Sequence, residues 1–293
     1  MVNQNEPIQL LDKGYVTLLD GMPHVYDSID LDYGVLRGAR PEADNPVRSR
    51  ETNLKLLRTL WNADPRPHSS PFEQPTIWLE IKAPDMVWRQ LNTHRWLSKN
   101  LFSGRYHEYA STDFYIPDKW RRQSLTNHQG SDGYVNKSMS EELSRILAFH
   151  AEMSFKIYKK VTDDGVAREM ARLFLPAWSL YVTGVVQLNL WSMINIVAQR
   201  ADDHAQWETQ QYGYAFLAIL RDFAPLTAEV VFGPRTAEES DRIFGFEPEA
   251  SGATGPAVVV PRSECEYCDS EPDGYGLCEE CGGCEDHCDG DCS

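Results

Sequence analysis

The distribution of cysteine constrains what this chain can fold into more than any other feature of its sequence. All seven Cys of the 293-residue chain lie between Cys265 and Cys292, and the preceding 264 residues contain none. A body of that length can be stabilised by a hydrophobic core alone. We therefore expect a cysteine-free body followed by a separate small unit.

Charge follows the same division. Residues 263–293 contain eleven Asp and Glu and no Lys or Arg, while the first 262 residues contain 33 acidic and 28 basic side chains. The nearly balanced body lacks the basic surface that nucleic-acid binding requires, so we expect no nucleic-acid partner. A small anion is still possible, because a few arginines suffice to bind one phosphate.

The sequence also bears on where the protein works. No run of about 18 apolar residues predicts a membrane span. The first 14 residues lack the basic-then-apolar order of a signal peptide. We therefore expect a cytoplasmic protein with no membrane partner.

Hydrophobic periodicity predicts an α+β body with dominant helices. Residues 8–23 indicate a strand, a turn and a strand, and residues 75–84 another strand. Helical spacing is found over residues 51–62, 85–97 with Asp85 as cap, 138–161, 165–175 and about 180–223, with a break near 201–203. We place one domain, the body, over 1–248, a linker over 249–262 and the tail over 263–293.

Residues 93–106, THRWLSKNLFSGRY, concentrate hydroxyl, amide, imidazole and guanidinium groups in one short segment. A helix end with such side chains can bind an anion, because free backbone N–H groups and Arg both favour phosphate. A solvated polar surface is the alternative interpretation of the same composition.

The order of these residues resembles the signature of the flavin-dependent thymidylate synthases. The matching residues are His94, Arg95, Ser98, Asn100, Ser103, Arg105 and Tyr106. The resemblance extends in the family's order over residues 11–20, 68–73, 88–90, 167–176 and 200–212. It implies that family's fold, with long central helices and an antiparallel sheet, and a homotetramer whose active sites are shared between chains.

The resemblance also implies a reaction, the transfer of a one-carbon unit from methylenetetrahydrofolate to C5 of dUMP, giving dTMP. FAD would be the cofactor, with folate and NADPH as co-substrates. The folate-only thymidylate synthases instead activate the pyrimidine with a Cys thiolate. That route is closed to a body without cysteine, which agrees with the flavin-dependent reaction.

Residue roles are carried over from the matching positions. Nucleotide contacts are expected from Gln90, Ser103, Gly104, Arg105, Arg172 and Arg200. Cofactor contacts are expected from His68, Ser70, Glu73, His94, Arg95, Asn189 and Asn195. Arg200 is the expected catalytic residue, because a fixed guanidinium beside the pyrimidine favours its N3-deprotonated form. An ordinary ion pair of Arg200 with Asp202 or Asp203 is the alternative.

A polar stripe of Ser192, Asn195 and Gln199 recurs at helical spacing beside apolar residues. Buried polar groups need partners, so we expect ligand or subunit contacts there, with a buried structural network as the alternative.

Five positions depart from the family's pattern. Thr93 and Trp191 stand in place of arginines, Leu101 in place of an acidic residue, Glu42 in place of a serine and Gln199 in place of an apolar residue. Trp191 could instead stack on an adenine. Drift within a divergent branch of the family would explain these departures without a change of reaction, and the dUMP reaction stays the main expectation. The departures also leave open two alternatives: a flavin-dependent hydroxymethylase acting on dCMP or dUMP, and a non-catalytic nucleotide-binding or zinc-ribbon interaction protein.

The tail has the spacing of a small zinc knuckle. Its predicted ligands are Cys265, Cys268, Cys278 and Cys281, two Cys-x2-Cys pairs separated by nine residues. Disulfides, an iron–sulfur site and a disordered acidic tail are the alternatives.

Overall fold

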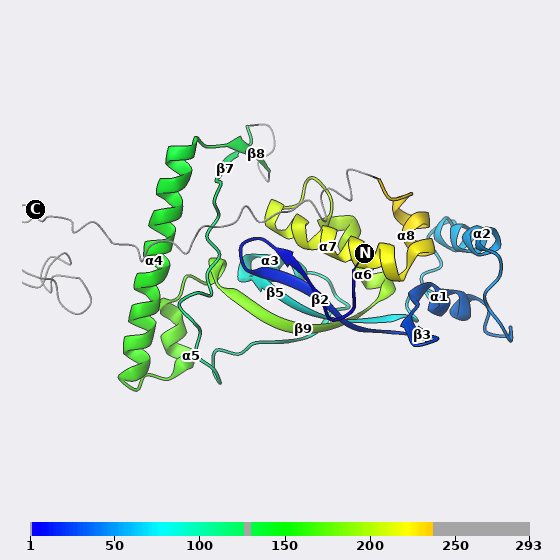
Figure 1. Cartoon of the computed structure of the whole chain (residues 1–293), viewed down its shortest axis with the longest axis horizontal. Coiled ribbons are helices and arrows are strands. Elements are labelled where there is room, and N and C mark those ends of the chain that lie inside the picture. The colour runs from blue at the N-terminus through cyan, green and yellow to red at the C-terminus, as the bar shows by residue number, and fades with distance from the viewer. Residues whose placement is uncertain (1, 126–129, 237–293) are drawn as a thin grey trace, which may run out of the picture. The chain divides into compact units, whose positions relative to one another are not determined.

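A computed structural model gives the fold of residues 2–125 and 130–236 (Figure 1). The predicted linker over 249–262 lies outside these residues. So do the predicted zinc ligands Cys265, Cys268, Cys278 and Cys281.

The centre of the body is a five-stranded antiparallel sheet. Its order is β1 (Pro7–Leu10), β2 (Gly14–Met22), β5 (Thr76–Pro84), β9 (Tyr181–Asn189) and β6 (Ser98–Leu101). Along β5, Ile77, Leu79 and Ile81 are buried, while Trp78 between them is 50% exposed. The alternation shows that one face of the sheet packs on the core and the other is more open.

Two helices cover the buried face. α6 (Leu190–Arg200) continues directly from β9, and α7 (Trp207–Phe223) crosses β1 and β2 (Figure 1). All residues of α7 from Glu208 to Arg221 are buried. A helix that is buried on all sides belongs to the core of the protein, so α7 forms the hydrophobic centre around which the sheet and α6 pack.

The remaining elements surround this core, and several of them add buried side chains to it. They are β3 (His24–Val25), β4 (Ser28–Ile29), α1 (Leu31–Ala39), α2 (Arg50–Trp61), α3 (Asp85–Leu91), β7 (Arg121–Gln123), β8 (Ser131–Tyr134), α4 (Lys137–Asp163), α5 (Arg168–Ala171), two 3-10 turns (Arg172–Phe174 and Ala177–Ser179) and α8 (Pro225–Phe232). The predicted helices over 51–62 and 138–161 are confirmed by α2 and α4.

The prediction of a helix from residue 180 is wrong over its first ten residues, most of which form β9. Val182, Thr183, Val185 and Val186 are β-branched and favour a strand. β9 is also hydrogen-bonded on both sides, to β5 and β6, so tertiary pairing decides its conformation.

The predicted helix over 85–97 is shorter than expected. α3 ends at Leu91, and its cap is Pro84, not Asp85, whose carboxylate instead accepts a hydrogen bond from Arg89 at 2.6 Å. Residues 98–101 form the edge strand β6 on β9. The signature therefore leaves a helix C-terminus and enters a strand, which corrects the interpretation of the segment as a helix end that binds an anion through free N–H groups.

Gly213 sets how closely α7 approaches the end of α6. A Cβ at this position would lie 2.5 Å from the backbone nitrogen of Ala201 and from the carbonyl carbon of Arg200. Gly to Ala inside a helix ordinarily stabilises by about 1 kcal/mol. For Gly213→Ala we expect the opposite sign, a loss of about 1–3 kcal/mol in the free energy of unfolding, because backbone atoms must move. Denaturant unfolding measures it, and equal or higher stability would contradict this packing.

Candidate active site

Arg200 is the last residue of α6, and its side chain lies across the C-terminus of α3. Its Nη2 donates to the carbonyl oxygen of Gln90 at 3.1 Å and to the hydroxyl of Thr93 at 2.9 Å. The last carbonyl groups of a helix lack partners and carry partial negative charge, so a guanidinium is stabilised there. Arg200 thus bonds to this helix end and not to Asp202 or Asp203, which accept from His204 and Gln210.

His94 is held by the same guanidinium. Arg200 Nε donates to His94 Nε2 at 3.2 Å, so that nitrogen is an acceptor and the ring proton is on Nδ1. Burial, and secondly the charge of Arg200, lower the pKa of His94 to about 4. At neutral pH the ring is therefore uncharged and offers its Nδ1–H as a donor to a ligand.

The end of the signature forms a tight turn after β6. Gly104 is buried there, and a Cβ on it would lie 2.4 Å from the ring of Tyr109. Arg105 Nε is 3.1 Å from the carboxylate of Glu169, and Arg172 Nε donates to the backbone carbonyl of Glu169 at 3.2 Å. Two exposed guanidiniums thus meet at one acidic residue, an arrangement that an anionic ligand can join.

A third group of predicted residues gathers at the N-terminus of α6. Asn189 caps the helix by accepting from Ser192 N at 2.8 Å, and the carbonyl groups of Phe72 and Pro75 accept from the next two backbone N–H groups. These bonds bring the segment with His68, Ser70 and Glu73, whose side chains are exposed, to this helix end. The first N–H groups of α6 all have partners, so side chains must provide the binding groups here.

Trp191 and Asn195 lie on the first turns of α6. The Trp191 ring packs on Trp61 and Phe72, with centroids 5.6 and 6.3 Å apart, so part of its surface is already used by protein contacts. Asn195 donates to the backbone carbonyl of Trp191 at 2.8 Å. The hypothesis that Trp191 stacks on an adenine therefore applies only to the part of its ring that remains uncovered.

The polar stripe of α6 has three different environments. Ser192 is buried, and its hydroxyl has no partner within the described part of the chain. Asn195 is half-buried, and Gln199 is exposed. The unpaired Ser192 hydroxyl beside Asn189 is the position of the stripe where a bound ligand would satisfy a polar group.

The predicted site residues thus form three groups. Gln90, His94 and Arg200 are hydrogen-bonded or adjacent at the C-terminus of α6, with Arg95 next in the chain. The second group is Ser103, Gly104, Arg105 and Arg172. The third contains His68, Ser70, Glu73, Asn189 and Asn195. At 1.5 Å per residue the two ends of α6 lie about 15 Å apart, so one elongated cofactor could contact the groups at both ends.

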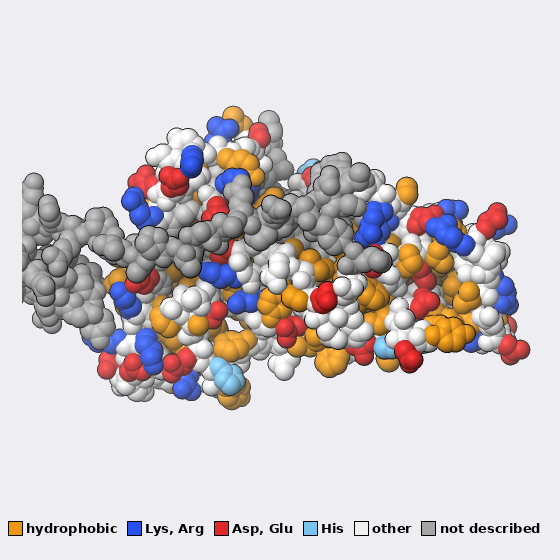
Figure 2. Space-filling view, viewed as in Figure 1, with side chains coloured by type: hydrophobic (Ala, Val, Ile, Leu, Met, Phe, Trp, Pro, Cys, Tyr) orange, Lys and Arg blue, Asp and Glu red, His pale blue; other side chains and the backbone are white. Residues whose placement is uncertain are grey.

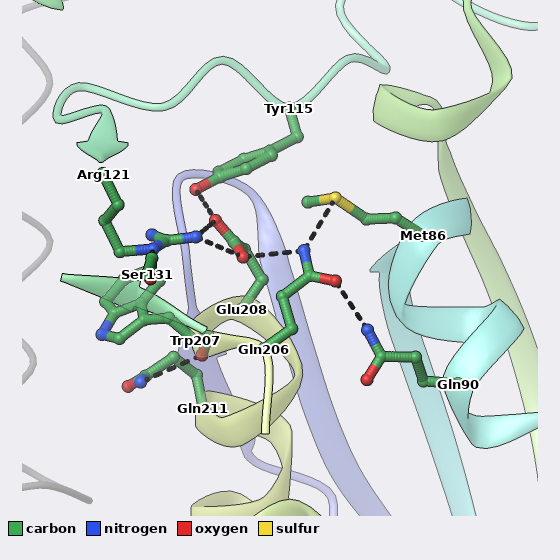
Figure 3. Close-up of polar contacts among 9 residues, drawn as sticks. All are labelled: Met86, Gln90, Tyr115, Arg121, Ser131, Gln206, Trp207, Glu208 and Gln211. Atoms are coloured by element: carbon green, nitrogen blue, oxygen red, sulfur yellow. Dashed lines mark hydrogen bonds and ion pairs between the residues drawn. The ribbon is translucent and has the colours of Figure 1, made fainter. Parts of the chain in front are cut away.

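Four residues to which the sequence assigned no role are linked to Gln90, one of them directly and the other three through that one. A continuous set of polar contacts ends at the Gln90 side chain and is formed by Tyr115, Arg121, Gln206 and Glu208 (Figure 3). Gln206 and Glu208 lie inside the matched block over 200–212, which was their only signal. Arg121 lies between the predicted elements, in a part of the sequence for which no helix or strand was predicted.

Residues 2–125 and 130–236 contain neither a cluster of metal-binding side chains nor a membrane-spanning helix. No three His, Cys, Asp or Glu side chains are grouped there as a metal site would require. In the same residues, no helix is long and apolar enough to cross a membrane.

Comparison with known proteins gives a consistent result. The family model described as thymidylate synthase complementing protein matches residues 18–226. The chain is 35% identical over 222 residues to the flavin-dependent thymidylate synthase of Kosmotoga olearia, covering 76% of this chain and 91% of that protein. It is 32% identical over 219 residues to that of Thermus thermophilus, covering 75% and 76%.

A solved structure has the same fold. The UMP/dUMP methylase PolB from Streptomyces cacaoi, bound with 5-Br UMP, superimposes with a TM-score of 0.65 at 26% identity. The match covers 77% of this chain and 96% of PolB.

The environment of His94 predicts a pH dependence. Its folded-state pKa of about 4 lies below the ordinary 6.5, so the unfolded chain binds the proton first as the pH falls. We expect the free energy of unfolding to decrease between about pH 6.5 and 4, with a smaller decrease in His94→Gln. NMR of the imidazole should give a midpoint near 4 that rises in Arg200→Met. A midpoint above 6 in the unmodified protein would contradict the Arg200–His94 contact.

Proposed function

The chain belongs to the flavin-dependent thymidylate synthase family, and we propose that it transfers a one-carbon unit from methylenetetrahydrofolate to C5 of dUMP, producing dTMP. The observation that carries this proposal is the position of Arg200, which is bonded to Gln90, Thr93 and His94 where the signature begins. The family's pyrimidine arginine is thereby held against its signature segment.

Arg200 provides the electrostatic part of the chemistry. Its guanidinium is half-buried and fixed by three acceptors, so its charge is less screened than that of a surface arginine. A pyrimidine placed beside it loses its N3 proton more readily, because the positive charge stabilises the anion. The anionic ring is the better nucleophile at C5.

Residues 103–105 and Arg172 would hold the phosphate of the nucleotide. Both guanidiniums contact Glu169, Arg105 at its carboxylate and Arg172 at its backbone carbonyl. A phosphate would offer the same two guanidiniums two or three oxygen acceptors. Gly104 keeps the turn compact under Tyr109. In this proposal the phosphate displaces the contact between Arg105 and Glu169.

The cofactor of the family is a flavin, which supplies the hydride when bound. The donor groups around α6 fit such a ligand, since the Nδ1–H of His94 and the unpaired hydroxyl of Ser192 are both available. We assign the remaining FAD contacts to His68, Ser70, Glu73, Arg95, Asn189 and Asn195. NADPH is the proposed source of reducing equivalents, and folate that of the carbon.

An assembly with shared sites is supported by exposed apolar side chains, two of which, Tyr106 and Leu173, are the chain neighbours of Arg105 and Arg172. The side chains of Trp96, Tyr106, Leu173 and Trp178 are 62–74% exposed. Figure 2 shows hydrophobic side chains on the surface around α5, the helix just before Arg172. Apolar surface of this extent favours burial by another subunit, so we propose the homotetramer expected for the family. One structural Zn²⁺ bound by the tail cysteines also remains a proposal.

The substrate can be tested directly. Flavin-loaded protein with NADPH and methylenetetrahydrofolate is given dUMP, UMP or dCMP in separate reactions, and the products are weighed by mass spectrometry. We expect methylated dUMP as the main product. A hydroxymethyl product, or a product from dCMP alone, would replace this proposal by the hydroxymethylase. A flavin-loaded protein that modifies none of the three would overturn the enzymatic assignment.

Arg200→Ala tests the catalytic assignment. We expect turnover of dUMP to fall by about 100–1000-fold, because a fixed charge beside the reacting group is lost. Bound flavin, read from its absorbance, should remain. Arg145→Ala, which removes an exposed arginine of α4, is the matched control and should keep full turnover. Turnover of Arg200→Ala within a few-fold of the control would refute the role.

A further inference from the structure

A chain of polar contacts joins the β7–β8 hairpin to the side chain of Gln90 (Figure 3). Arg121 Nη2 lies 2.7 and 2.8 Å from the two carboxylate oxygens of Glu208. Gln206 Nε2 donates to Glu208 at 2.9 Å, and Gln90 Nε2 donates to Gln206 Oε1 at 2.6 Å. The contacts run from β7, across the start of α7, to α3.

At the Arg121–Glu208 end of this series of contacts, the carboxylate is buried and has several partners. The Glu208 side chain is only 5% exposed, and it also accepts from the hydroxyl of Tyr115 at 3.3 Å. The Arg121 guanidinium lies over the ring of Trp207 at 5.3 Å, and its Nε donates to Ser131 at 3.1 Å. A buried carboxylate paired with a guanidinium is strongly held, because separating the pair would leave a buried charge uncompensated.

The chemistry of the acceptors fixes which way each amide points. The NH₂ group of Gln206 lies between Glu208 and the thioether sulfur of Met86, at 2.9 and 3.4 Å. A carboxylate and a thioether accept hydrogen bonds and donate none, so the amino group of Gln206 must face them. Its carbonyl oxygen then faces Gln90, which must turn its own amino group toward it.

Gln90 is left with one orientation. One of its amide N–H bonds is used by Gln206, and its carbonyl oxygen points away from Gln206 (Figure 3). The side chain therefore presents an oxygen acceptor and one remaining N–H to a ligand. Without Gln206 the amide could rotate by half a turn and exchange these two groups.

We propose that Arg121, Glu208 and Gln206 are positioning residues that fix the orientation of the Gln90 carboxamide toward the nucleotide. The proposal rests on the proposed function, in which Gln90 contacts dUMP. Arg121, Glu208 and Gln206 touch no reacting atom, and they act on nucleotide affinity through Gln90. The β7–β8 hairpin is thereby coupled to the nucleotide site.

A double-mutant cycle tests this coupling. The Kd for dUMP is measured by calorimetry on the flavin-loaded protein, for the unmodified chain, Gln206→Met, Gln90→Ala and the double variant. Gln206→Met removes the amide, keeps the bulk and leaves the Arg121–Glu208 pair in place. We expect it to weaken dUMP binding by about 3–10-fold, as for the loss of one neutral hydrogen bond. In the Gln90→Ala background the same change should have no further effect.

A second variant changes Glu208, which contacts Gln206 on the side away from Gln90. Glu208→Gln keeps the shape of the side chain but can donate as well as accept, so the amide of Gln206 is no longer oriented. Its effect on the Kd should also disappear in the Gln90→Ala background. Gln187→Met, an exposed glutamine of β9, is the matched control and should leave the Kd unchanged.

The outcomes separate the two levels of the proposal. An unmodified chain that does not bind dUMP would overturn the proposed function. If the unmodified chain binds dUMP and Gln206→Met weakens binding equally in both backgrounds, Gln206 does not act through Gln90. That result would overturn the proposed positioning role and indicate a direct contact of Gln206 with the nucleotide. If Gln206→Met changes the Kd in neither background, the proposed positioning role is also overturned.

Discussion

The pairing of β5 with β9 is the constraint on which the site depends. The two strands pair along nine residues, from Thr76 opposite Asn189 to Pro84 opposite Tyr181. α3 follows β5 at one end of this ladder, and α6 follows β9 at the other. Because α6 then runs back over the sheet, its last residue, Arg200, reaches the C-terminus of α3. Gln90 and Arg200, which are 110 positions apart in the sequence, are therefore brought into contact by helices and strands and not by a loop.

The same meeting point gives a physical account of Thr93. Its hydroxyl accepts from Arg200 and donates to the carbonyl of Gln90 at 2.7 Å, so it links the guanidinium to the helix end. An arginine there would place a second positive charge beside Arg200, and like charges at short range are destabilising without an anion between them. The substitution thus stabilises the ligand-free arrangement of Arg200.

Particular elements show what the sequence could and could not predict. The strands β2 and β5 and the helices α2 and α4 were predictable because each has its own hydrophobic period and clear ends. β9 was missed because its valine-rich run continues without a break into α6, and strand pairing decided the outcome. The signature named His94 as a candidate site residue, and the structure brings it into contact with Arg200. The signature could not predict the Arg121–Glu208 pair, since 87 residues separate the two and neither has a local pattern.

The signature segment is divided among a helix end, an edge strand and a turn. Thr93 and His94 are bonded to α6, whereas residues 103–105 are held by the turn under Tyr109 and by contact with Glu169. A substitution in one part leaves the bonds of the other intact. With the roles proposed above, selection can alter the cofactor contacts of such a chain while its phosphate contacts are inherited unchanged, so one contiguous motif can evolve as two independent units.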